Sequence, residues 1–367
     1  MNIKTILVLL LFLVAVVGII APVNATVDSI TSKDKIYSVE FKEKSVKYKI
    51  TFDANGGKIS SSKAISTNIK KGTKIKKFPT PKRSGYIFNG WYTKKSGGTK
   101  ISKSTKPRNS ITYYAQWKDT PGTYEKKLKS LIKDNSISAE AKNELIRILK
   151  IQLQNPEILN SIIKNKIKIS VIPIGMFMTD LPEFKGLVKA STFDGRSWKY
   201  VRGVSYVPYK GNIYVGVGEE NLIGEYPQIE SLRHSGMQER YHKGYSVTTH
   251  ELAHTIHYYI LSQNDKNIIK DCYKKTKSSG NWVDGPGKCY ASENEREYFA
   301  QLSNAYLGTN NGYDPTTNNP RNNGKEWVKN NDIVMYNLLK KIYKNGEVND
   351  IYPDGSLKEG GKITNDY

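Results

Sequence analysis

The 367-residue sequence has only two cysteines and a single long apolar run, which lies at its N-terminus. Cys272 and Cys289 allow at most one disulfide, which would close a loop of about 18 residues and add about 3 kcal/mol of stability. In an exported chain such a pair favours a disulfide, and two free thiols are the alternative. No later segment has the apolar length to span a bilayer, which argues against a multi-span membrane protein.

Acidic residues are also scarce, since 34 Asp and Glu face 57 Lys and Arg and leave a formal net charge of +23. An excess of this size favours anionic partners such as wall polymers or membrane head groups. Solubility alone is the alternative explanation, and the two interpretations carry equal weight. The lysines are spread out and no nucleic-acid motif is present, so we expect no nucleic-acid partner.

The N-terminal run is typical of a targeting segment. Lys4 supplies a positive charge, and residues 6–20 are almost wholly apolar. Small residues then stand where a signal peptidase would read them, with cleavage expected after Ala25. This pattern predicts a signal peptide over residues 1–25, and hence a secreted or surface-associated protein. An uncleaved membrane anchor is the alternative, although the run is shorter than the roughly 20 residues that a spanning helix needs.

The next residues predict a linker and then a small β module. Residues 26–45 are rich in Lys, Ser and Thr with weak periodicity, which indicates a linker. Within residues 46–118 the apolar and aromatic alternation predicts strands over 46–52, 85–92 and 111–117. Aromatic residues at this spacing are more typical of a core than of a ligand platform.

This module resembles the Listeria–Bacteroides repeat, also called the internalin B-repeat. Its hallmarks stand in order: TFDANGG at 51–57, G-x-x-F-x-G-W-Y-T at 85–93, the pair Gly97-Gly98, and Y-A-x-W at 114–117. The resemblance implies a β-grasp-like module of surface proteins. It also implies a possible partner, either an anionic cell-wall polymer or a surface protein.

The rest of the chain predicts helices and a small sheet. Apolar spacing predicts a helical linker or subdomain over 119–165, and a further domain follows over 166–367. Residues 212–217 form the best strand there, and we expect it to be the sheet edge that receives an extended peptide, with an interior position as the alternative. Glu219 and Glu220 either bind calcium or cap a turn.

The sharpest motif is His250-Glu251-Leu252-Ala253-His254, preceded by Thr248 and Thr249 as possible helix caps. On a helix, positions i and i+4 lie about 40° apart and about 6 Å along the axis, so two imidazoles can face one zinc ion. The intervening glutamate can then act as a general base on water.

A third ligand must come from elsewhere in the chain. His257 lies about 10 Å beyond His250 along the helix, so we expect it to pack near the core. Ile260 stands where a metzincin requires histidine. A capping box at Ser292 and Glu295 predicts a helix starting at Ser292.

Downstream of that predicted cap, Glu297 has no local role. Spacing alone leaves it open as a third ligand or as a solvated acid.

These segments resemble the catalytic domain of the anthrax lethal factor-like peptidases, which include the Pro-Pro endopeptidases. The resemblance covers about residues 195–345 and rests on HExxH together with Tyr290, Glu297 and the following Tyr-Phe-Ala. It implies that Glu297 is the third zinc ligand and that Tyr290 donates a hydrogen bond to the oxyanion. Gln301 stands where relatives often have an acid, and we expect its amide oxygen to accept from a histidine ligand.

We therefore expect an α+β protein, with a β-grasp-like module before a mainly helical, zincin-like domain containing a small sheet. The predicted function is a gluzincin-like zinc metalloendopeptidase acting as a monomer on extracellular proteins or peptides. His250, His254 and Glu297 would bind Zn²⁺, and Glu251 would be the general base. The alternative is a non-catalytic surface adhesion or wall-binding protein with a vestigial peptidase domain.

Overall fold

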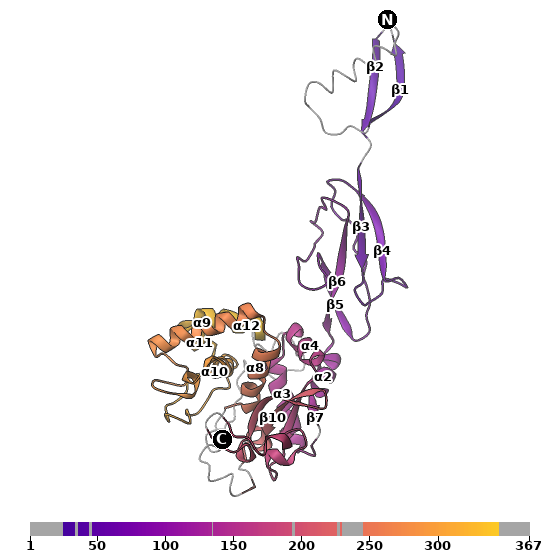
Figure 1. Ribbon diagram of the computed structural model, residues 1–367. Helices are drawn as coiled ribbons and strands as arrows, with labels where there is room; N and C mark the ends of the chain where they lie inside the picture. The colour runs from indigo at the N-terminus through magenta and orange to yellow at the C-terminus, as the bar shows by residue number, and fades with distance from the viewer. Residues whose placement is uncertain are drawn as a thin grey trace. The chain divides into compact units, whose positions relative to one another are not determined.

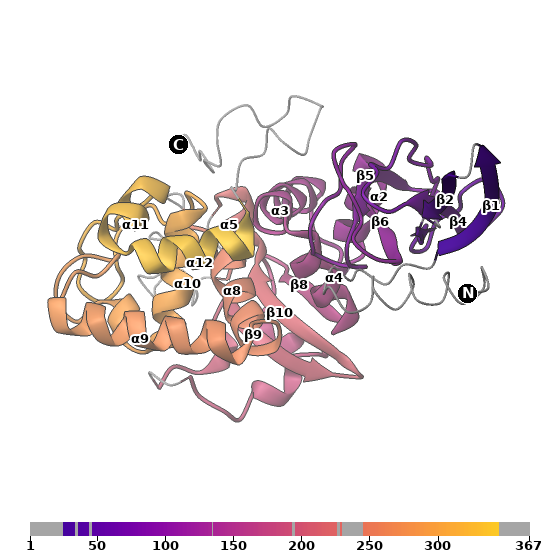
Figure 2. The same ribbon diagram turned by 90° about the horizontal axis from the view of Figure 1, so that it is seen from above.

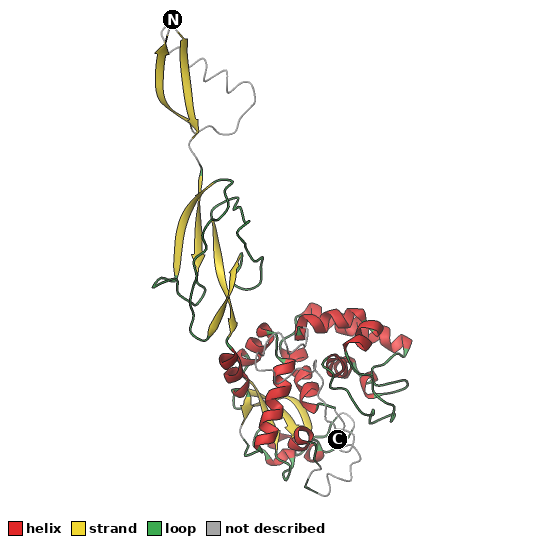
Figure 3. Ribbon diagram, turned by 180° about the vertical axis from the view of Figure 1, so that it is seen from behind, coloured by secondary structure: helices red, strands yellow, loops and turns green. Residues whose placement is uncertain are grey.

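The computed structural model describes residues 25–33, 36–43, 46–133, 135–192, 195–225, 228–229 and 245–344. The chain divides into two compact units, one ending at Asp119 and the other beginning at Thr120. The described residues of the first unit form strands and loops, whereas the second unit combines a sheet with all of the described helices (Figures 1 and 3). This arrangement confirms the predicted α+β class. The predicted signal segment lies outside the described residues except for Ala25.

The linker predicted over residues 26–45 is wrong in its local structure, because two paired strands occupy it. Strand β1 (Ala25–Lys33) pairs antiparallel with β2 (Ile36–Glu43). Strand β1 contains Thr, Val and Ile residues, and β2 contains Ile, Tyr, Val and Phe, all of which favour extended backbone. Strand β1 lacks a clear period-two pattern, whereas Tyr37, Val39 and Phe41 of β2 alternate with polar residues, a strand signal that the linker prediction overlooked.

The module predicted over residues 46–118 is a four-stranded sheet in the order β4-β3-β6-β5. Its strands are β3 (Lys47–Asp53), β4 (Ala64–Lys70), β5 (Tyr86–Tyr92) and β6 (Ile111–Asp119). Alternate residues point to one face, where Ile50, Phe52, Trp91 and Tyr113 are buried together. The predicted aromatic core is therefore confirmed.

The second unit is built on a four-stranded sheet in the order β7-β8-β10-β9. The strands are β7 (Ile132–Lys133), β8 (Ile167–Ile172), β9 (Gly203–Tyr209) and β10 (Asn212–Gly218). Strand β10 pairs with β8 on one side and with β9 on the other. The predicted edge strand over residues 212–217 is therefore an interior strand, and β9 is the edge next to it.

Helices pack against one face of this sheet and share its core, whereas the segment with the first three 3₁₀ turns packs against the other face. They are α2 (Pro121–Lys129), α3 (Ala139–Gln152), α4 (Pro156–Lys164), α5 (Glu219–Ile223), α8 (Val247–Tyr259), α9 (Gln263–Ser279), α10 (Glu295–Tyr306), α11 (Lys325–Asn331) and α12 (Ile333–Tyr343). Short 3₁₀ turns occupy Met178–Asp180, Lys185–Leu187, Trp198–Tyr200 and Tyr290–Ser292. Figure 2 shows α8 beside β9 and β10.

The helices predicted as a subdomain over 119–165 belong to the same body as the domain that follows. Leu128, Leu149 and Leu159 lie in one buried cluster with Leu252 of α8. Strand β7, which was not predicted, also joins α2 to the sheet by pairing with β8. The subdomain therefore completes the hydrophobic core under α8.

The predicted disulfide is absent, since Cys272 and Cys289 are both buried free thiols. Burial raises the pKa of each thiol to about 12, with Asp332 adding to the rise for Cys272 and Asp284 for Cys289. Both thiols are thus protonated at neutral pH and act as small packing residues. Within the described part of the chain, no helix combines the length and the apolar character that crossing a bilayer requires.

Candidate metal centre

Helix α8 carries the histidine motif with one side in the core. Its cap is Ser246, whose hydroxyl accepts from the Thr249 amide, rather than the predicted Thr248 or Thr249. Leu252 and Ile256 are fully buried in the core beneath the helix. This anchoring fixes the rotation of α8, and the two motif histidines share another face.

Helix α10 brings Glu297 to the same place. The predicted capping box is wrong, because Ser292 ends a 3₁₀ turn and Asn294 caps the helix by accepting from the amides of Arg296 and Glu297. Glu297 therefore sits in the first helical turn, where the helix dipole favours a carboxylate. Helices α8 and α10 pack directly against each other.

The three side chains converge on one point. The Nε2 atoms of His250 and His254 are 3.0 Å apart, and the Glu297 Oε2 atom lies 3.1 and 3.2 Å from them. A tetrahedral zinc ion with bonds of about 2.1 Å separates its ligand atoms by about 3.4 Å. These are the three described residues whose ligand atoms lie close enough to hold a metal ion.

Hydrogen bonding shows that Glu297 Oε2 and His250 Nε2 suit a cation. Glu297 Oε2 is buried and has no hydrogen-bond partner. His250 Nδ1 lies 3.0 Å from Gln301 Oε1, an acceptor, so that nitrogen carries the proton and Nε2 presents a lone pair. Acceptors pointing at one buried spot are unfavourable without a positive charge. The donor set of two imidazoles and one carboxylate matches zinc.

Electrostatics couple the acids and the histidines. Burial opposes the charged form of Glu297, but His254 and His250 hold its pKa well below the usual range. Burial likewise opposes the charged form of His254, yet Glu297 and Glu251 raise the pKa of that imidazole. The pKa of Glu251 is raised, mainly by burial, which the two histidines and a hydrogen bond from Ser205 counteract. A carboxylate with a raised pKa is suited to taking and returning a proton.

Strand β9 supports Glu251 from the other side. Strand β9 pairs with Tyr214 and with Gly216 of β10, and the register shifts between these two pairs. Ser205 and Tyr206 occupy the resulting β-bulge. Tyr206 adopts a φ of 45°, and Ser205 hydrogen-bonds the Glu251 carboxylate. Bulges at edge strands commonly redirect a side chain next to an active site.

A cleft of about 770 Å³ opens over these groups. Its lining includes His250, Glu251, His254 and Glu297, edge strand β9 and Tyr290. The Tyr290 ring centroid is 5.9 Å from that of His250. A space of this size accommodates several residues of an extended chain.

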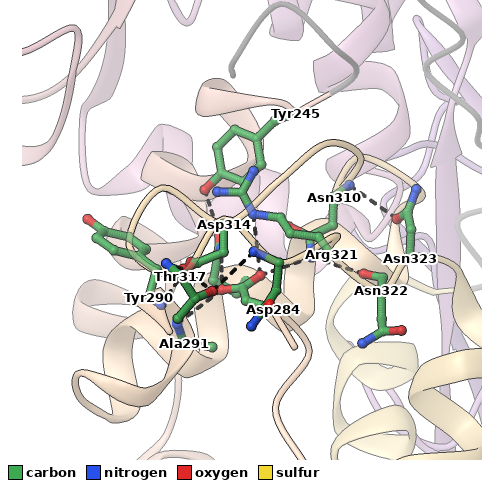
Figure 4. A network of polar contacts seen from close by, with 12 residues as sticks. Tyr245, Asp284, Tyr290, Ala291, Asn310, Asp314, Thr317, Arg321, Asn322 and Asn323 are labelled. Atoms are coloured by element: carbon green, nitrogen blue, oxygen red, sulfur yellow. Dashed lines mark hydrogen bonds and ion pairs between the residues drawn. The ribbon is translucent and has the colours of Figure 1, made fainter. Parts of the chain in front are cut away.

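Tyr290 is held by its backbone. Its amide donates to Asp314 Oδ2 at 2.9 Å, while Asp314 Oδ1 accepts from the Thr317 amide and hydroxyl (Figure 4). Asp314 is fully buried. The turn that carries Tyr290 is therefore pinned to the segment around Asp314.

Other predicted positions have structural roles. His257 packs its ring 5.4 Å from Phe299, and burial lowers its pKa to about 4, so it is neutral and apart from the three converging ligand atoms. Glu219 accepts from the amides of Ser138 and Ile174. Glu220 pairs with Arg202 at 2.6 Å. The calcium alternative is therefore not supported by the described residues, and both acids stabilise the chain around α5.

Four residues that contact the site or its supports were not predicted: Gly203, Ser205, Tyr245 and Asp284. The Tyr245 hydroxyl lies 2.8 Å from His250 Nδ1 and donates to Gln301 at 2.6 Å. None of the four stands in a recognisable motif, and all lie outside the two helices that provide the ligand atoms. Only the glycine pair Gly203 and Gly216, at strand positions, signals a close approach of backbone to other groups.

Comparisons with known proteins identify a known repeat in the first unit. Residues 48–116 match the Listeria-Bacteroides repeat domain family. Internalin H of Listeria monocytogenes serovar 1/2a (strain ATCC BAA-679 / EGD-e) is 38% identical over 72 residues, which are 19% of this chain and 12% of that protein. A Pro-Pro endopeptidase of Paenibacillus alvei is a structural neighbour at a TM-score of 0.38 and 20% identity, covering 59% of this chain and all of that one.

Proposed function

We propose that the second unit is a zinc-dependent endopeptidase that acts outside the cell. The observation that carries the proposal is the convergence of His250, His254 and Glu297 on one buried point beside Glu251. When bound there, zinc polarises the scissile carbonyl and lowers the pKa of the attacking water. The cleft above the point is large enough for a peptide, and a repeat related to that of a Listeria internalin supports a surface or extracellular location.

The chain's own residues divide the chemistry between them. Glu251 accepts a proton from the attacking water and returns it to the leaving amine. Tyr290 donates a hydrogen bond to the charge that develops on the carbonyl oxygen. Among the described strands β9 pairs with β10 alone, so an extended substrate pairs with its outer edge in β-augmentation.

Metal removal is the first test. We expect the purified protein to contain one zinc ion per chain and to cleave members of a random peptide library. Treatment with 1,10-phenanthroline should abolish cleavage, because the site then lacks its Lewis acid. One equivalent of zinc should restore cleavage, whereas excess magnesium should not, since two of the three donors are imidazole nitrogens and magnesium prefers oxygen ligands. Full cleavage by protein shown to be metal-free would contradict the proposal.

The repeat module supports a second function, binding of an anionic surface polymer. Residues 46–118 contain sixteen lysines and two arginines against one acid, Asp53. All sixteen lysines are exposed. Lys47 and Lys70 stand directly opposite each other on β3 and β4, and Lys49 follows on the same face. Like charges in opposed positions destabilise a sheet, so an external anion would relieve this repulsion.

We therefore expect the full chain to bind polyglycerol phosphate, with an affinity that falls steeply between 50 mM and 500 mM NaCl because salt screens exposed charges. Changing Lys47, Lys49 and Lys70 together to Glu should weaken binding at least about tenfold. The same reversal at Lys74, Lys103 and Lys106, in loops of the module, is the charge-matched control and should cost less. Binding that is equally weakened by both sets would show that net charge acts without a defined face, and absence of binding would contradict the function.

A further inference from the structure

Behind His250 lies a buried carboxylate that the proposed chemistry does not use. Asp284 is fully buried, and its Oδ2 atom accepts from Gln301 Nε2 at 2.7 Å and from the Ala291 amide at 3.0 Å. Its Oδ1 atom accepts from Asn310 Nδ2 at 3.3 Å and lies 3.4 Å from Arg321 Nε. Burial raises the pKa of Asp284, whereas these donors all favour its ionised form and oppose that rise.

Arg321 closes this network on the side of Tyr245. Its guanidinium carbon lies 4.3 Å from the centre of the Tyr245 ring, and Figure 4 shows the side chain between that ring and Asp284. The Tyr245 hydroxyl in turn contacts His250 and Gln301. Arg321 thus compensates the buried negative charge of Asp284 and also packs against Tyr245, whose hydroxyl contacts His250.

Asp284 determines which way the Gln301 amide points. Because Gln301 Nε2 donates to Asp284, its Oε1 must face His250 Nδ1, 3.0 Å away. An acceptor at that position fixes the proton on Nδ1 and leaves the Nε2 lone pair for the metal. Without Asp284, the amide can turn over and present its NH₂ group to His250, which favours the wrong tautomer.

We propose that Asp284 is a positioning residue that acts in two directions. Through Gln301 it sets the tautomer and orientation of His250 for zinc, and through the Ala291 amide it holds the turn that presents Tyr290. The inference rests on the proposed zinc site. In a carboxylate–histidine–zinc arrangement a carboxylate accepts from the metal-bound histidine. Asp284 provides that carboxylate here, and the Gln301 amide lies between it and His250.

Asp284→Asn tests the first direction. We expect the zinc dissociation constant, measured against a chromophoric chelator, to rise about 10- to 100-fold. In the metal-free protein, ¹⁵N NMR of the imidazoles should show a loss of the Nδ1-protonated form of His250. Asp314→Asn is the matched control, because Asp314 also binds the Tyr290 turn, whereas Gln301 donates to Asp284 and not to Asp314. It should lower peptide cleavage while zinc affinity and tautomer stay as in the wild type.

The pair Gln301→Glu with Asp284→Asn separates the two directions. It places a carboxylate directly against His250, so zinc affinity should return to within a few-fold of the wild type. Cleavage should stay low, because the introduced asparagine turns its NH₂ group toward the new carboxylate and leaves no acceptor at the place where Oδ2 of Asp284 held the Ala291 amide. If Asp284→Asn does not fold, Gln301→Met, which removes the same link, must show the same loss of zinc affinity.

Two outcomes distinguish this inference from the proposed function. Unchanged zinc affinity and tautomer in a folded Asp284→Asn or Gln301→Met protein would overturn the positioning role. Zinc binding with no peptide cleavage in the wild type would instead refute the peptidase function and leave this inference standing.

Discussion

Glu251→Gln should lower kcat for peptide cleavage by about 10³-fold, within the range that a general acid–base contributes. An amide of the same shape still accepts the hydrogen bond from Ser205 but cannot take a proton from water. The zinc ligands are untouched, so zinc content and affinity should match those of the wild type. In the metal-free protein the substitution also removes a buried charge, so the thermal midpoint should not fall.

Glu293→Gln is the control for this experiment, since that carboxylate only approaches Lys288 at 3.9 Å. Its kcat should equal that of the wild type. A Glu251→Gln enzyme that retains more than a tenth of the wild-type kcat would show that another group performs the proton transfer. A zinc-loaded wild type with no cleavage of any library member would favour the alternative, a surface protein with a vestigial peptidase domain.

Local sequence was sufficient for elements whose signal is complete within a few residues. The HExxH spacing predicts two histidines on one helical face, and the structure brings both to one point with Glu297. The alternation of residues 46–118 predicts the repeat sheet because core and surface residues alternate on each strand. Beyond these elements, the role of Glu297 as a ligand and that of Tyr290 stay predictions.

Features that depend on distant segments were not predictable in the same way. The pairing of β10 with both β8 and β9 decides which strand is the edge, and no local pattern in 212–217 encodes it. Asn294 and Ser292 are both good helix caps, and the 3₁₀ turn before α10 selects Asn294. Asp284 lies 34 residues from His250 in a loop rich in glycine, where its sequence context indicates only a turn.

Strand β9 lies so close to α8 at Gly203 that we expect a substitution there to have the second large effect on catalysis. A Cβ atom on Gly203 would lie 2.6 Å from Glu251 Oε1 and 2.8 Å from Val247 Cγ1, both shorter than real contacts. The backbone there is extended and paired with Val217, so the obstacle to alanine is steric. Val247 is stiff in a helix, whereas the Glu251 side chain can move. The added methyl group therefore displaces the carboxylate from the position it needs for proton transfer.

Gly203→Ala should accordingly lower kcat about 10²-fold, as expected when a reacting group moves by about 1 Å. Overpacking should also lower stability by about 1–3 kcal/mol in a denaturant titration. Zinc affinity should stay near the wild-type value because the atoms nearest the new methyl group belong to Glu251 and Val247 and not to the three ligand residues. Gly122→Ala is the control, since nothing lies within 4 Å of its added Cβ, and its kcat should be unchanged.

Adding Val247→Ala to Gly203→Ala distinguishes the two contacts. It removes the clash with Cγ1 but leaves the one with Glu251. Stability should therefore recover in part while kcat stays low, because proton transfer depends on the carboxylate and not on the valine. Recovery of kcat along with stability would show that the defect lies in the packing of β9 against α8. A wild-type kcat in Gly203→Ala itself would mean that β9 shifts without disturbing Glu251, and that the strand does not position the general base.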